Sequence, residues 1–147
     1  MLTAVRTILL AEDNINDIEL TLAALRSNGV ANEIVVVRDG AAALDYLYRR
    51  GVFASRSPEP PGLILLDLKM PKVDGLEVLQ KIKTDEKLKT VPIVALTSSR
   101  ESPDVLRCYD YGVNAFVVKP VDYSDFVNTV KQLGAFWAKI NQPPLQP

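Results

Sequence analysis

Several polar residues stand directly after short apolar runs in this sequence, and their types suit phosphoryl chemistry. Glu12 and Asp13 follow the first run, Asp67 the third, Thr97 the fourth and Lys119 the fifth. A carboxylate can attack phosphorus and become an acyl phosphate. Clustered carboxylates bind a cation such as Mg²⁺, which prefers oxygen ligands, and a lysine neutralises charge on phosphoryl oxygens. The residue types therefore predict metal-assisted phosphoryl transfer onto a carboxylate.

Five apolar runs alternate with five segments in which apolar residues recur every three or four positions. The runs are typical of short strands buried on both faces, and the spacing between them is that of amphipathic helices. The runs cover residues 7–11, 34–37, 63–66, 93–96 and 115–118. Such alternation predicts an α/β fold, in which right-handed crossovers build a parallel sheet with helices on both faces.

Three segments carry more detailed expectations. Residues 51–62 carry three prolines together with serine and arginine and predict an extended surface loop. The fourth helix is predicted to use Val105, Leu106 and Tyr109 as its apolar face. The final helix carries a longer apolar stripe, which consists of Phe126, Val130, Leu133, Trp137 and Ile140.

The polar residues meet only if the strands are ordered suitably. Ligands of open parallel sheets bind beyond the carboxyl ends of the strands, at a topological switch point. The strand order 2-1-3-4-5, which the sequence does not itself give, would bring Glu12, Asp13 and Asp67 together and place Thr97 and Lys119 beside them. Ionised carboxylates about 5 Å apart repel by roughly 3 kcal/mol per pair at an effective dielectric constant of about 20. A bound divalent cation relieves this repulsion.

Composition excludes several classes of function. The chain of 147 residues has 17 basic and 18 acidic side chains, a balance that does not predict a nucleic-acid or anionic lipid surface. It has no histidine, which excludes a Ser-His-Asp or Cys-His site. The single cysteine, Cys108, favours a reducing compartment. With no apolar stretch of about 20 residues and no signal-peptide pattern, we expect a cytoplasmic chain that does not cross a membrane.

Four motifs together resemble the receiver domains of bacterial two-component response regulators. The motifs are residues 8–14 (ILLAEDN), 65–71 (LLDLKMP), 96–98 (LTS) and 118–120 (VKP). The resemblance extends from about Arg6 to about Lys139. The long loop before Leu63, the segment 120–122 and the aromatic pair at 136–137 look most like the small regulators that partner bacterial phytochrome kinases.

The resemblance implies a role for each motif residue. Asp67 would be the phosphoacceptor. Asp13 and Asp67 would ligate Mg²⁺ together with the backbone carbonyl of Lys69, while Glu12 would hold a metal-bound water. Thr97 and Lys119 would bind the phosphoryl oxygens.

The resemblance also implies a switch and a backbone feature. Phe116 would change rotamer when Thr97 moves, and the Lys119–Pro120 peptide would be cis. Many receivers have two aspartates where this chain has Glu12 and Asp13, a substitution that keeps the charge.

At the level of the whole chain, the resemblance implies one flavodoxin-like receiver domain over residues 1–147. Its core would span about 6–140, with a proline-rich tail over 141–147 and no output domain. The domain would accept phosphate from a sensor histidine kinase, a phytochrome kinase in the narrower reading, rather than act as an enzyme. A homodimer is expected through the fourth helix, fifth strand and fifth helix, with Phe136 and Trp137 as interface candidates.

Each residue also has a structural explanation. Asp13 or Asn14 could cap the following helix, Asp67 could be a turn residue, and Lys119 a surface charge. Thr97 and Ser98 could likewise form a turn or a cap, while Phe116 and Trp137 could be packing residues of the core. The functional interpretation is favoured because the signals at the strand ends agree with one another.

Three other classes of protein compete with the receiver. A haloacid-dehalogenase-like phosphatase would need a second aspartate two residues after the nucleophile, where this chain has Lys69. A flavodoxin-type nucleotide or flavin binder would need a glycine-rich phosphate loop after the first strand, which is missing. A receiver that has lost its chemistry and serves as a scaffold would not need the acidic residues, threonine and lysine that are present.

Overall fold

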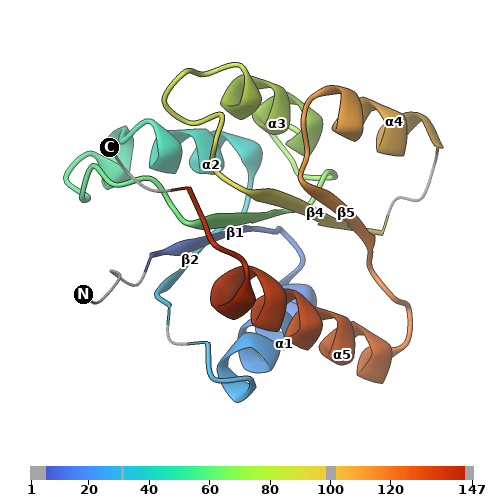
Figure 1. The fold of residues 1–147 in the computed structure, drawn as a ribbon. Coiled ribbons are helices and arrows are strands. Elements are labelled where there is room, and N and C mark those ends of the chain that lie inside the picture. Colours follow the sequence, from blue (N-terminus) through green and yellow to red (C-terminus); the bar gives the residue numbers. More distant parts are fainter. Residues whose placement is uncertain (1–5, 31, 99–101, 145–147) are drawn as a thin grey trace.

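The computed structural model describes residues 6–30, 32–98 and 102–144, and its centre is one parallel sheet (Figure 1). The strands are β1 (Ile8–Ala11), β2 (Ile34–Val37), β3 (Leu63–Leu66), β4 (Ile93–Thr97) and β5 (Ala115–Val118). They lie in the order β2-β1-β3-β4-β5, with every neighbouring pair parallel. The predicted fold class and the strand order on which the site depends are therefore confirmed.

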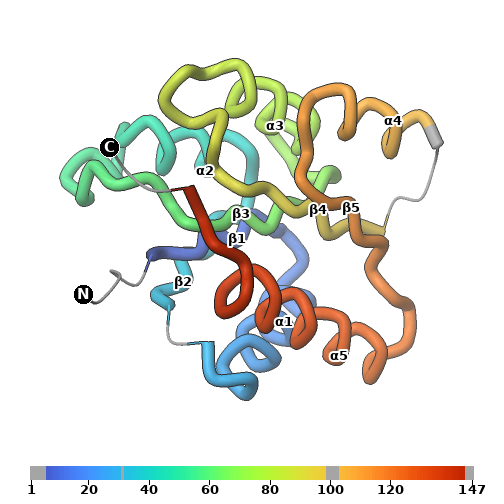
Figure 2. Tube along the Cα trace, in the orientation of Figure 1, coloured from blue at the N-terminus to red at the C-terminus, as the bar shows by residue number. Residues whose placement is uncertain are grey.

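Helices cover both faces of the sheet. They are α1 (Ile15–Ser27), α2 (Gly40–Leu47), α3 (Gly75–Lys83), α4 (Ser102–Asp110) and α5 (Tyr123–Gly134). In Figures 1 and 2, α1 and α5 lie against one face, and α2, α3 and α4 lie against the other. Within the described residues, the structure has no helix that is long and apolar enough to cross a membrane.

Two apolar cores result from the alternation of side chains along the strands. Leu9 and Leu66 point into the core beneath α2 and α3, whereas Leu10 and Leu65 point into the core beneath α1 and α5. The central strands β1, β3 and β4 are buried along their whole length. This buried framework fixes the positions at which the three strands end.

Four helices begin at a side chain that caps the helix. Asn14, Asp39, Asp74 and Asp122 each accept a hydrogen bond from the backbone amide three residues ahead. Such caps satisfy amides that have no partner within the helix and stabilise it by about 1 kcal/mol each. The cap of α1 is Asn14, so Asp13 is left available for the site.

Some sequence predictions about solvent exposure need correction. The 51–62 loop is not extended throughout, because it begins with a 3₁₀ turn, η1 (Gly51–Phe53). In α4 the side chain of Cys108 is buried, while Leu106 and Tyr109, which were predicted to belong to the apolar face of this helix, are exposed. The strand β5 lies at the sheet edge and is only partly buried. The spacing of apolar residues marks one face of a helix, but it does not show whether the sheet covers that face.

The end of the last helix also differs from its prediction. After Gly134 the chain continues as a π-helical segment, η2 (Ala135–Ile140), whose wider turns shift the helical phase. Trp137 still packs against the α1–α5 core, as predicted, but Ile140 is exposed rather than buried. The proline-rich tail is described as far as residue 144.

Candidate functional site

The site forms where β1 and β3 end side by side. Ala11 of β1 is in register with Leu66 of β3, so the next residues, Glu12 and Asp67, are neighbours. The amide of Asp67 donates to the carbonyl of Ala11 (3.0 Å), and the amide of Glu12 donates to the carbonyl of Val37 in β2 (3.0 Å). Backbone hydrogen bonds therefore fix both carboxylates at the carboxyl edge of the sheet.

Three carboxylates gather at this edge. Glu12, Asp13 and Asp67 each offer an oxygen within 4.8 Å of the other two. Glu12 and Asp67 are buried, whereas Asp13 is closer to solvent. Burial raises the pKa of Glu12 to about 7, because its ionised form is poorly solvated there. An all-oxygen cluster of this kind is compatible with a divalent cation of the Mg²⁺ or Mn²⁺ type.

Lys119 is the lysine, among the described residues, whose ammonium group contacts these carboxylates. Its backbone amide donates to the carbonyl of Thr97 (2.8 Å). This hydrogen bond extends the pairing of β4 and β5 by one residue beyond Val118. Its Nζ lies 2.5 Å from Glu12 and 3.1 Å from Asp67. Although burial opposes the charge, hydrogen bonds to Asp17 and Glu12 and the charge of Asp67 raise the pKa of Lys119 above its ordinary value. The lysine is therefore a permanent cation.

Asp17 is a site residue that the sequence reasoning missed. Its Oδ2 accepts a hydrogen bond from Lys119 Nζ at 2.8 Å. In the sequence Asp17 looks like an ordinary acid in the first turn of α1, where negative charge is favoured by the helix dipole. The only available signal in the sequence was its place in the first turn of the helix that follows Glu12 and Asp13.

The backbone after Asp67 is shaped to support that side chain. The amide of Lys69 donates to Asp67 Oδ1 (3.1 Å). Gly75 is the first residue of α3 and lies close to the backbone of Asp67. A Cβ at this position would be 2.3 Å from the carbonyl oxygen of Asp67. Because contacts this short are forbidden, any residue larger than glycine would displace the Asp67 loop. Gly75 is thus a second residue whose importance the sequence did not indicate.

The remaining predicted residues lie beside the cluster or away from it. Thr97 is fully buried at the end of β4. Phe116 of β5 is partly buried and packs against the α2–α3 core. Phe136 and Trp137 lie near the other end of α5 and form an edge-to-face pair with ring centroids 5.1 Å apart. The aromatic pair is therefore not part of the carboxylate site.

The Lys119–Pro120 peptide was expected to be cis, and this expectation is wrong. The described part of the chain contains no cis peptide bond. The trans form is favoured before proline by about 0.5–1 kcal/mol. Lys119 reaches Glu12 and Asp67 from the trans backbone, so the contacts of its ammonium do not require the cis form.

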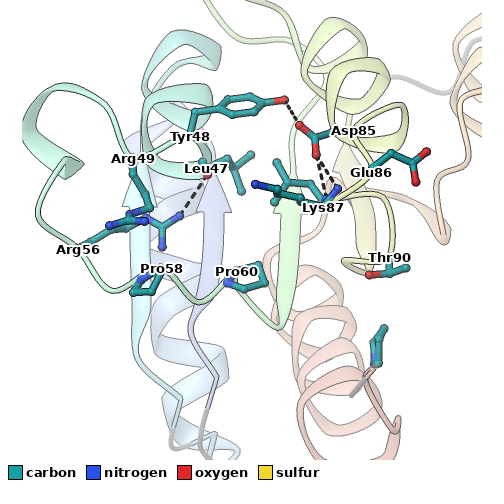
Figure 3. Close-up of a pocket in the computed structure, with 12 residues that line it drawn as sticks. Leu47, Tyr48, Arg49, Arg56, Pro58, Pro60, Asp85, Glu86, Lys87 and Thr90 are labelled. Atoms are coloured by element: carbon teal, nitrogen blue, oxygen red, sulfur yellow. Dashed lines mark hydrogen bonds between the residues drawn. The ribbon is translucent and has the colours of Figure 1, made fainter. Parts of the chain in front are cut away.

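A separate pocket of about 750 Å³ lies at the opposite edge of the sheet (Figure 3). It is formed by the end of α2, the proline-containing loop before β3 and the loop before β4, and Leu47 and Leu88 contribute apolar surface. Tyr48 donates to Asp85 Oδ2 across it (3.0 Å). None of the predicted site residues lines this pocket, so its size does not make it the chemical site.

Comparisons with known proteins agree with the geometry. The family model described as response regulator receiver domain matches residues 8–131. Response regulator Rcp1 of Synechocystis is 39% identical over 132 residues, which are 90% of this chain and 88% of Rcp1, and the crystal structure of its Mn²⁺-bound form superposes with a TM-score of 0.90.

Two further solved structures are similar over nearly their whole length. The phosphorylated cyanobacterial phytochrome response regulator RcpA is 42% identical, with a TM-score of 0.91 over 97% of this chain and all of RcpA. The bacteriophytochrome response regulator AtBRR is 54% identical, with a TM-score of 0.76 over 95% of this chain and all of AtBRR. With the fold, the carboxylate cluster and these matches in agreement, the chain belongs to the response regulator receiver domain family, whose members are signalling modules of two-component systems rather than classical enzymes.

Proposed function

We propose that Asp67 accepts a phosphoryl group from a sensor histidine kinase with the help of Mg²⁺. The observation that carries this proposal is the position of the Asp67 carboxylate, which is buried, 3.1 Å from Lys119 Nζ and part of the carboxylate cluster. Glu12, Asp13, Asp67 and the carbonyl of Lys69 would hold the cation. Bound there, Mg²⁺ would neutralise charge on the phosphoryl oxygens.

The residues of the chain suit each part of the transfer. An oxygen of Asp67 attacks phosphorus, the bond from phosphorus to the donor histidine nitrogen breaks, and its electron pair stays on the imidazole. The product is an acyl phosphate on Asp67. Lys119 already donates to the Asp67 carboxylate and is placed to donate to a phosphoryl oxygen added there. Burial of the site excludes most of the solvent that would screen these charges.

Phosphorylation would then bias the surface made by α4, β5 and α5. A phosphoryl group adds about 1.5–2 negative charges and strong acceptor oxygens. Thr97 stands at the end of β4 beside this position and Phe116 lies on the neighbouring strand, in register with Ala95. A hydrogen bond from Thr97 to the phosphoryl group would favour an inward rotamer of Phe116, which is a population shift rather than a new fold.

The similar proteins suggest the kind of kinase. RcpA is a cyanobacterial phytochrome response regulator and AtBRR is a bacteriophytochrome response regulator. We therefore assign this chain a phytochrome-type histidine kinase as its phosphoryl donor and the cytoplasm as its place of action. Such a kinase would present its phosphohistidine to the exposed rim of the carboxylate cluster, near Asp13.

Acetyl phosphate with Mg²⁺, followed by intact mass spectrometry, tests the acceptor directly. The native chain is expected to gain the mass of one phosphoryl group, and Asp67→Asn, which keeps the size of the side chain, is expected to gain none. Asp13→Asn is expected to need more Mg²⁺ for the same yield. An adduct of equal yield in Asp67→Asn would place the acceptor elsewhere.

We also propose that the α4–β5–α5 surface forms a homodimer. Two of these elements carry exposed apolar side chains, since Leu106 and Tyr109 of α4 and Tyr123 of α5 are 65%, 54% and 68% exposed. Phe136, in η2 beyond the end of α5, is also exposed, whereas Trp137 packs partly against the core beneath α1 and α5. Aromatic and aliphatic residues of this kind anchor protein interfaces.

Sedimentation velocity at tens of micromolar tests the dimer. We expect the phosphorylated chain to sediment as a dimer and Leu106→Glu to be monomeric. Val52→Glu is the matched control, because Val52 is 89% exposed but lies in η1, away from the surface. A native chain that stays monomeric with and without phosphorylation contradicts the proposed interface.

A further inference from the structure

We propose that Asp17 is a positioning residue that keeps Lys119 beside the phosphoacceptor when a cation occupies the carboxylate cluster. The inference rests on the proposed function and adds a residue to it. An ammonium group has three N–H donors, and Lys119 Nζ directs them at three carboxylates, those of Glu12, Asp17 and Asp67.

The three partners of Lys119 are not equivalent. Glu12 and Asp67 belong to the cluster whose oxygens lie within 4.8 Å of one another, whereas Asp17 does not. A divalent cation at that cluster would be held by Asp67 directly and by Glu12 through a bound water, and it would repel the nearby ammonium. Asp17 is then the one described carboxylate that can still hold Lys119 without sharing it with the metal.

Asp17 is well anchored for this task. Its own backbone amide is the one that Asn14 Oδ1 caps (3.1 Å), so the first turn of α1 is fixed at this residue. The next residue, Ile18, is buried in the core beneath α1 and α5. The Asp17 side chain is only 24% exposed, and it meets Lys119 at 2.8 Å across 102 positions of sequence. The contact therefore joins α1 to the end of β5.

Loss of the Asp17 carboxylate should act through Lys119. In Asp17→Asn the ammonium would lose an ionised partner and settle more firmly on Glu12 and Asp67, where it competes with the cation. We expect Mg²⁺ affinity, measured by isothermal titration calorimetry on the unphosphorylated chain, to fall about tenfold, within the range of measured couplings between sites. Phosphorylation at saturating Mg²⁺ should slow by a smaller factor, because Lys119 is then less well placed.

A double-mutant cycle separates positioning from simple loss of charge. In the background of Lys119→Met, Asp17→Asn is expected to change Mg²⁺ affinity less than twofold, because the residue through which it acts is gone. An electrostatic effect of Asp17 on the cation itself would instead appear in both backgrounds, and that result would overturn the proposal.

Two further variants complete the test. Glu19→Gln removes the same charge from an exposed position of the same helix and is expected to leave Mg²⁺ affinity unchanged. Asp17→Glu keeps the carboxylate and is expected to recover part of the affinity. Equal weakening by Asp17→Asn and Glu19→Gln would also overturn the proposal. Since calorimetry needs no phosphoryl transfer, a chain that binds Mg²⁺ normally but is never phosphorylated would refute the proposed function and leave this inference standing.

Discussion

Two lysines of this chain, at opposite edges of the sheet, each direct their ammonium group at three oxygen atoms. At the carboxyl edge, Lys119 contacts the carboxylates of Glu12, Asp17 and Asp67. At the amino edge, where β4 and β5 begin, Lys83 contacts the carbonyls of Lys89 (3.1 Å) and Val91 (2.9 Å) and the side-chain oxygen of Asn114 (3.0 Å). The number of contacts is the same, but the charge around them is not.

The different surroundings move the two pKa values in opposite directions. Burial lowers the pKa of Lys83, because neutral oxygens do not compensate for the lost hydration. Charged partners raise the pKa of Lys119 in spite of burial. Arg56 follows the pattern of Lys83, since it donates to the carbonyls of Tyr46 and Leu47 and burial lowers its pKa. The cations of the amino edge thus hold backbone in place.

The comparison distinguishes two kinds of lysine. Lys83 holds backbone in place, whereas the carboxylate partners of Lys119 can also bind a metal ion. In the carboxylate cluster and its surroundings, Lys119 contacts the three carboxylates of Glu12, Asp17 and Asp67, and Asp13 adds a fourth, whereas Arg38 and Lys72 at the same edge contact the carbonyl of Asp13 and the side chain of Asp39. That leaves an excess of negative charge which a cation can relieve. The three neutral oxygens around Lys83 carry no excess of negative charge, so they are not expected to bind a metal ion or to assist a phosphoryl group.

Removal of the lysine at the carboxyl edge should have the largest effect. Lys119→Met leaves Glu12 and Asp67 buried without a compensating charge, and the loss of one partner from a buried ion pair costs about 3–5 kcal/mol of unfolding free energy. We expect a loss of this size in urea unfolding without metal. Because a cation can replace part of the missing charge, saturating Mg²⁺ should restore more stability to Lys119→Met than it adds to the native chain.

Lys119→Arg is the matched variant for that experiment. It keeps the charge but replaces the compact ammonium with a planar group of different donor geometry. We expect it to recover stability without recovering phosphorylation from acetyl phosphate. If Lys119→Met were as stable as the native chain and indifferent to Mg²⁺, the excess of negative charge would have no energetic consequence and the contrast between the two lysines would fail.

The sequence predicted the strands and helices well because their signals are local. The run at 63–66 is followed at once by Asp67, and in the structure it is a strand that ends at Leu66, directly before that residue. The exposure of Leu106 and Ile140 was predicted wrongly for a different reason. Helical spacing marks an apolar face, but the edge position of β5 and the π-helical segment after Gly134 decide what covers that face.

The site was predictable only in part, because some of its residues are placed by the strands and others by the packing of helices. Glu12, Asp67 and Lys119 directly follow strands, so their convergence follows from the sheet order alone. Asp17 is on a helix, and its part in the site depends on how closely α1 approaches the end of β5. Gly75 depends on the approach of α3 to the carbonyl of Asp67. Distances between packed elements leave no periodic signal in the sequence.

A smaller effect is expected at the amino edge. Lys83→Met leaves the carbonyls of Lys89 and Val91 without their donor, and an unsatisfied polar group costs about 1–3 kcal/mol when buried and less where water can reach it. We therefore expect a loss near the lower end of that range in urea unfolding, with no dependence on Mg²⁺ and with phosphorylation within about twofold of the native rate. Lys81→Met, an exposed lysine of the same helix, should change neither quantity. If the loss of unfolding free energy in Lys83→Met depended on Mg²⁺, the two edges of the sheet would be coupled. The distinction between a structural role for Lys83 and a role for Lys119 in the metal site would then be wrong.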